Sequence, residues 1–135
     1  MNALNTAIYS TLTGDATLVA LLADATSVYH LQAKDGAPFD FVVYNKMSAI
    51  EPNTEAHRII NAVYQIRAYS DQSAQAADAI DARIDALLHN QAVSITGYTR
   101  LRLVRTDSIE MTENLPNGLT VWSSGGLYQI RLEKN

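Results

Sequence analysis

The sequence contains no cysteine, which excludes disulfides, thiolate metal sites and cysteine catalysis. No apolar run approaches the roughly 20 residues that a helix needs to cross a bilayer. The first ten residues, MNALNTAIYS, lack the basic and hydrophobic regions of a signal peptide. We therefore expect a protein that is made in a cytoplasm and has no membrane partner.

Motifs for catalysis are also missing. The six glycines form no phosphate-binding loop between a strand and a helix, and no serine lies in a Gly-x-Ser-x-Gly elbow. His30, His57 and His89 lie far apart along the chain, without a ligand neighbour at helical spacing. Because a zinc site needs convergent ligands, this spacing favours surface or strand-end histidines. We expect no catalytic residue, no cofactor and no metal.

The residues that are present make an ordinary globular composition, with 47% hydrophobic and 18% charged. A chain of 135 residues can bury a sizeable core, and we expect one domain over 1–135. The net charge of −4 disfavours a dedicated nucleic-acid binder, which must neutralise phosphates. Residues 1–90 hold 10 acids and 5 bases, whereas residues 91–135 hold 4 acids and 5 bases. A head-to-tail assembly of copies could use this asymmetry.

The stretch from Ile59 to Leu88 organises the predicted fold. Its first part, 59–70, is rich in β-branched and aromatic residues and predicts a strand. Its second part, 71–88, repeats apolar residues three and four apart, which predicts a helix capped by Ser70 or Asp71. The apolar stripe consists of Ala77, Ile80, Ile84, Leu87 and Leu88. This helix must bury its stripe, and the nearest apolar surface is a sheet.

The N-terminal region predicts a bent pair of helices over 3–12 and 16–23. Leu4, Ile8 and Leu12 have helical spacing, and Gly14 ends the first helix. Asp15 is placed to cap the second helix, because its carboxylate can accept from free N–H groups of the first turn.

The middle of the chain predicts a first hairpin. A short strand over 28–32 leads into a turn-rich loop over 33–38. The next segment, 39–48, alternates well enough for a strand. It is joined to the strand over 59–70 by a polar loop, 51–55, so the two strands are expected to pair.

The C-terminal region predicts a second hairpin. Its first strand covers 98–113, with Leu101 and Leu103 on one face and Arg100 and Arg102 on the other. The Asn-Gly turn lies within Leu115–Gly118. The returning strands are 119–122 and 127–132, with a bulge or kink expected at Ser123–Gly126 because paired glycines weaken a strand.

These elements predict an α+β fold. We expect a mainly antiparallel four-stranded sheet made of two hairpins. One long helix and the bent N-terminal helical pair are expected to pack on one face of this sheet.

The long helix carries three acidic residues, Asp78, Asp81 and Asp85, at spacings of three and four, which place them on one flank. This flank is open to three interpretations: a weak divalent-cation site, an acidic docking stripe, or a solvated face that Arg83 partly neutralises.

The last hairpin carries the arginines Arg100, Arg102, Arg105 and Arg131. They can be partner-facing, since arginine is favoured at interfaces, or they can cover the open face of the sheet. A nucleic-acid contact is disfavoured because aromatic residues are not interleaved with them. The candidate oligomer interface therefore consists of Arg100, Arg102, Arg105, Arg131, Asp78, Asp81 and Asp85, with the acids of one copy facing the arginines of the next.

The order of motifs resembles the tail-completion, or tail-terminator, proteins of long-tailed bacteriophages and prophages. The matching pieces are GDATLVALLAD, VYHLQ, APFDFVVYNKMS, VYQIRAYS with the helix DQSAQAADAIDARIDALL, and the final hairpin ending GGLYQIRLE. Together they extend over most of the chain.

This resemblance implies a structural role and no catalytic residue. It implies a ring, usually a hexamer, that caps the finished tail tube and joins it to the head connector. The implied partners are copies of the chain, the tail tube protein and the head-connector proteins, at the tail–head junction of the virion. DNA could pass through the ring without sequence-specific contact. The alternative is a small α+β enzyme or ligand-binding domain without a recognisable motif.

Overall fold

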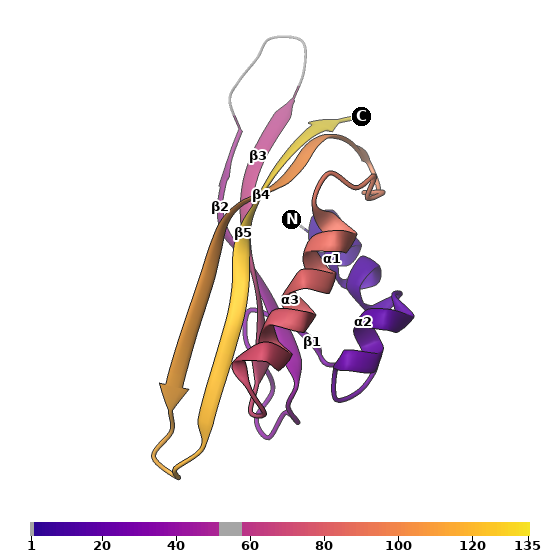
Figure 1. The fold of residues 1–135 in the computed structure, drawn as a ribbon. Coiled ribbons are helices and arrows are strands. Elements are labelled where there is room, and N and C mark those ends of the chain that lie inside the picture. The colour runs from indigo at the N-terminus through magenta and orange to yellow at the C-terminus, as the bar shows by residue number, and fades with distance from the viewer. Residues whose placement is uncertain (1, 52–57) are drawn as a thin grey trace.

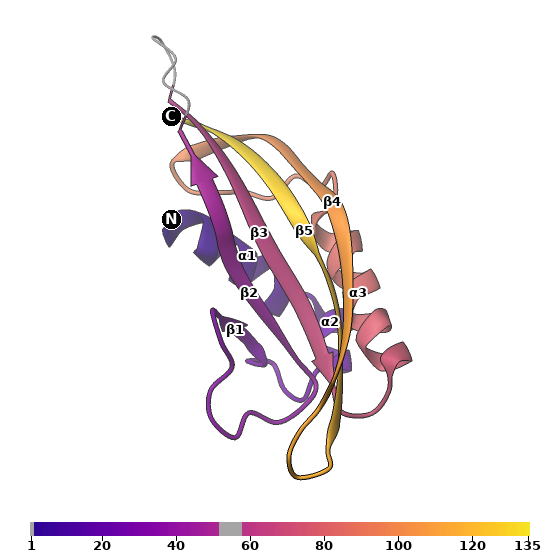
Figure 2. The ribbon, with the colours of Figure 1, turned by 90° about the vertical axis from the view of Figure 1, so that its left-hand side faces the viewer.

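The computed structural model describes residues 2–51 and 58–135. The described helices are α1 (Asn2–Thr13), α2 (Ala16–Leu21) and α3 (Ala74–Leu88), and the described strands are β1 (Val28–His30), β2 (Phe41–Ile50), β3 (Ile59–Ser70), β4 (Tyr98–Asn114) and β5 (Thr120–Lys134). Figure 1 shows all three helices on one face of a single sheet. Figure 2 shows the opposite face of the sheet, which we call the open face. The fold is α+β, as the sequence predicts.

The sheet has five strands in the order β1-β2-β3-β5-β4, so the predicted four-stranded sheet is wrong in this respect. The additional strand is β1, which pairs in parallel with β2 through Val28 and Val42 and makes the sheet mixed. The two predicted hairpins are present and antiparallel. A strand of three residues pairs with whichever sheet edge lies beside it in the folded chain, and its own residues do not predict which edge that is.

The core lies between the sheet and the helices. Alternate residues of β3, from Ile60 to Ser70, are buried, which is the pattern of a strand with one face on a core. The predicted stripe of α3 packs against that face, with Ile80, Ile84 and Leu88 almost fully buried. The N-terminal helix α1 is attached by a polar contact, because the Tyr64 hydroxyl donates to Asn5 Oδ1 at 2.6 Å. Burial raises the pKa of the Tyr64 hydroxyl to about 12.

The helix caps confirm one prediction and correct another. Asp15 caps α2, and its carboxylate accepts from the backbone N–H of Leu18 at 2.9 Å. The cap of α3 is Ser73, whose hydroxyl accepts from the N–H of Ala76 at 3.1 Å, so the assignment to Ser70 or Asp71 is wrong. Ser70 still belongs to β3, and its hydroxyl accepts from Gln72 N–H in the connecting turn. Residues 71–73 form the connection between β3 and α3, and the apolar periodicity of the helix does not distinguish them from its first turn.

The last hairpin is the longest part of the sheet, and its turn projects past the N-terminal end of α3 (Figure 1). The expected bulge or kink at Ser123–Gly126 is wrong, because β5 pairs with β3 in unbroken register from Trp122 to Glu133. The register shifts are in β4 instead, between Arg100 and Arg102 and between Arg105 and Asp107. A bulge adds one unpaired residue to a strand, so each residue after it points to the face opposite to the one that plain alternation predicts.

The polar loop predicted over 51–55 lies, beyond Glu51, outside the described residues, as does His57. Of the helices that the structure describes, none combines the length and the apolar character required to cross a membrane.

Candidate assembly interface

A groove runs between α3 and the middle of β4 and β5. Its volume is about 620 Å³, and its lining residues come from the acidic flank of the helix and the facing strands. They are Asp78, Asp81, Ala82, Asp85, Arg105, Ser108, Glu110 and Ser124. We call this the acidic groove. It collects the three predicted aspartates and adds Glu110, which the sequence analysis did not single out.

The floor of the acidic groove is an ion pair between Arg105 and Asp81. Arg105 Nη1 and Nη2 each donate to one Asp81 carboxylate oxygen at 2.8 Å, which is the strong bidentate geometry. Asp81 is only 8% exposed. This hydrogen bonding raises the pKa of Arg105 above its usual value. Asp81 is therefore not on a solvated face, and within the described structure its carboxylate binds Arg105 of the same chain.

The ion pair is held from several sides. Ser124 Oγ donates to Asp81 Oδ2 at 3.2 Å, and Arg105 Nη2 donates to the carbonyl oxygen of Gly125 at 2.8 Å. A Cβ at Gly126 would lie 2.6 Å from Arg105 Nε and 2.5 Å from the Asp107 carbonyl oxygen. Gly126 is therefore required so that the guanidinium can lie against β5.

Asp85 and Asp78 differ from Asp81. The Tyr128 hydroxyl donates to Asp85 Oδ1 at 3.4 Å, and Asp85 is half-buried. Burial raises the pKa of Tyr128, so this hydroxyl stays a donor at neutral pH. Asp78 is exposed at the mouth of the groove.

Arg83 does not neutralise the acidic flank, contrary to one interpretation of the sequence. Its Nε and Nη2 donate to the two carboxylate oxygens of Asp15, each at 2.8 Å, which ties α3 to the start of α2. The hydrogen bond from Arg83 lowers the pKa of Asp15 to about 2. The acids of the groove are consequently balanced by Arg105 alone among the groove residues.

Arg100 and Arg102 lie on opposite faces of the sheet, so the prediction that they share a face is wrong. Arg100 pairs with Leu132, which is buried under the helices, whereas Arg102 pairs with Arg131. The cause is the bulge at Leu101, which is 45% exposed although Leu103 is 1% exposed. Arg102 and Arg131 are thus brought together on the open face, and both are exposed.

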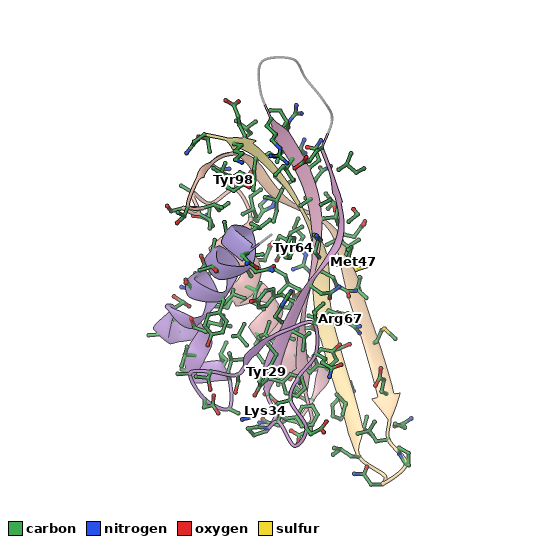
Figure 3. The ribbon with its side chains drawn as sticks, turned by 180° about the vertical axis from the view of Figure 1, so that it is seen from behind. Tyr29, Lys34, Met47, Tyr64, Arg67 and Tyr98 are labelled. Atoms are coloured by element: carbon green, nitrogen blue, oxygen red, sulfur yellow. The ribbon has the colours of Figure 1, made fainter. Side chains whose placement is uncertain are left out.

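The open face has a second arginine feature that the sequence analysis missed. Arg67 lies across β5, and its Nη2 donates to Ser123 Oγ at 2.6 Å. A Cβ at Gly125 would lie 2.8 Å from Arg67 Cγ. Figure 3 shows Arg67 and Met47 on the side of the sheet opposite the helices. Adjacent glycines in a strand leave space on both faces of the sheet, and here Gly125 makes room for Arg67 and Gly126 for Arg105. The Gly-Gly pair is therefore the feature of the sequence that could have indicated these two arginine positions.

The histidines have structural contacts. His30 stacks on Tyr44 with 5.2 Å between ring centroids, and His89 Nδ1 accepts from the Arg105 backbone N–H at 3.0 Å. Within residues 2–51 and 58–135, no three His, Asp or Glu residues form a group that could hold a metal ion.

The comparison with protein families decides the class of the protein. The family model "Tail completion protein gp17" matches residues 6–126. The chain belongs to this family. It is therefore a structural protein of a bacteriophage tail.

Solved structures share the fold. One chain from the virion of a native gene transfer agent particle matches with a TM-score of 0.80 at 17% identity, over 98% of this chain and 96% of that one. A second solved protein matches with a TM-score of 0.62 at 16% identity, over 96% of this chain and 94% of that one. A comparison with curated protein sequences finds no match.

Proposed function

We propose that this tail completion protein forms a ring of identical copies that caps the finished tail tube and joins it to the head connector. The family match over residues 6–126 is the observation that carries the proposal. Membership in a structural family also favours assembly over the alternative of a small enzyme or ligand-binding domain. The likeness to a chain of a virion particle is consistent with a fold that works inside an assembly.

The mechanism is geometric. Copies that contact each other through two different surfaces form a closed ring when the rotation between them closes. The resemblance to tail-completion proteins implies six copies. One face of the ring matches the end of the tail tube and stops the addition of tube subunits. The other face receives the head connector, and DNA passes through the centre without sequence-specific contacts. The site of action is the tail–head junction of the virion, after synthesis in the host cytoplasm.

The proposal is tested by removing the gene from the phage or prophage that encodes it. Electron microscopy of the lysate should show full heads and separate tails, with tube ends that are abnormal in length or left open. Purified protein added to this lysate should restore joined particles and infectivity. Normal particles in the absence of the protein, or labelled antibody bound only at the distal tail tip, would refute the proposed role.

A further inference from the structure

We infer that Arg102 and Arg131 bind the acidic groove of a second copy of the chain. The two arginines are directly opposite each other on the neighbouring strands β4 and β5. Like charges in this position destabilise a sheet. Two exposed guanidiniums held side by side are well suited to bind carboxylates, which would relieve their repulsion.

Among the described residues around the arginine pair, carboxylates are fewer than guanidiniums. On β3, the residue opposite Arg131 is Asn61, and on β5 the residue opposite Val104 is Gln129. Both are uncharged. Glu133 follows on the same face of β5 and is one carboxylate for two guanidiniums. Leu101 precedes Arg102 at the bulge and is also exposed. We call this patch the arginine pair.

The acidic groove has the complementary charge. Its lining has four carboxylates, Asp78, Asp81, Asp85 and Glu110, and one guanidinium, Arg105, which gives a formal charge of −3. Because Arg105 already binds Asp81, the carboxylates that remain for a partner are Asp78 and Glu110 at the mouth, both exposed, and the half-buried Asp85. A groove of about 620 Å³ has room for arginine side chains.

The positions of the two surfaces determine the kind of assembly. The arginine pair is on the open face, whereas the groove is on the helical face of the same strand, eight residues further along β4 at Glu110. Eight residues of strand correspond to roughly 26 Å. A contact between different surfaces on opposite faces is heterologous, so it produces rings or filaments and no symmetric dimer. The inference therefore rests on the proposed ring and deepens it by naming the contact between copies.

The test is a charge swap measured by size-exclusion chromatography with light scattering. The wild-type chain should form an oligomer larger than the 14.8 kDa monomer. Arg102→Glu with Arg131→Glu should reduce it to the monomer, as should Asp78→Lys with Glu110→Lys. The variant that combines all four substitutions should assemble again, because both surfaces then carry reversed and complementary charges. Restored assembly requires a folded chain, so this variant separates a lost contact from a lost fold.

The control matched to the arginine variant is Lys34→Glu with Lys46→Glu. It makes the same change in net charge as Arg102→Glu with Arg131→Glu, at two exposed residues outside both surfaces. This control should retain the wild-type oligomer mass. Circular dichroism should show that all variants are folded.

Three results would overturn the inference. The first is a wild-type mass that stays at 14.8 kDa at millimolar concentration. The second is an oligomer that is unaffected by the arginine substitutions or not restored by the four-fold variant. The third is binding of a short DNA duplex that the arginine substitutions abolish while the oligomer persists, because the pair would then recognise phosphate. The proposed function is tested separately, since joined particles in the lysate do not depend on which residues form the contact.

Discussion

The most informative stability test is Arg105→Ala, which leaves Asp81 buried without its cation. The two side chains are 13% and 12% exposed, so solvent screens the remaining carboxylate poorly. Removal of one partner from a buried pair costs about 3–5 kcal/mol, much of it from the unpaired charge. Ser124 Oγ still donates to Asp81 in the variant and offsets part of this cost, so we expect a loss of about 3 kcal/mol.

Urea unfolding followed by circular dichroism measures this loss. With a slope of about 2 kcal/mol per molar for a chain of this size, the midpoint should fall by about 1.5 M. The control is Arg105→Met combined with Asp81→Leu, which removes both charges and fills the space with apolar atoms. Replacement of a buried ion pair by apolar residues is often neutral, so the double variant should recover more than half of the lost stability.

Two outcomes would refute this reasoning. A loss below about 1 kcal/mol in Arg105→Ala would mean that the pair behaves like an exposed salt bridge. A double variant no more stable than Arg105→Ala would mean that the cost comes from packing and from the bond to Gly125, since no unpaired charge remains in it.

Three further predictions concern single residues. Gly126→Ala should lower the free energy of unfolding by about 1–3 kcal/mol, measured in urea, because the added carbon meets the Asp107 carbonyl oxygen. Gly36→Ala is the comparison: Gly36 has open space around it but a positive φ, so this substitution tests backbone strain alone. Asp40 is 5% exposed, and burial raises its pKa, so the folded state retains this proton to a higher pH than the unfolded state does. The free energy of unfolding should therefore fall as pH rises from the ordinary aspartate pKa to the raised one. Asp40→Asn should abolish this fall. Asp15 has a pKa lowered to about 2, so its contribution is present above pH 3.8 and is lost as pH falls toward 2. Asp15→Asn keeps a capping oxygen, and its stability deficit should therefore shrink over that acid range.

The sequence predicts the elements whose burial is periodic. The strand β3 and the end of α3 at Leu88 are found as predicted, because each places apolar residues on one face of a regular element. The pairing of β1 with β2 and the position of β5 between β3 and β4 are set by backbone hydrogen bonds between distant segments. No periodicity within a segment contains that information.

Residue type and charge nominate the residues of the candidate interface, but they do not predict how these residues are arranged. Residue type and charge select both Asp81 and Arg105, and alternation from Leu103 places Arg105 on the helical face, but no pattern within either segment predicts that Arg105 binds Asp81, 24 residues away. From the sequence alone, the glycines at 125 and 126 predict a weak point of β5, because glycine is unfavourable in strands. Their actual effect is steric, since each leaves room for an arginine on a different face of the sheet.

The bulge at Leu101 and the Arg105–Asp81 pair act together on the proposed assembly. The bulge separates the positive charge of the hairpin, because it places Arg100 on the helical face and Arg102 beside Arg131 on the open face. The ion pair then fixes β4 to α3, and these two elements carry the two surfaces proposed to meet. A ring closes only when the angle between its two contact surfaces is constant from copy to copy. Loss of the ion pair should therefore broaden the distribution of oligomer masses before it unfolds the chain, which links the stability of the groove floor to the closure of the ring.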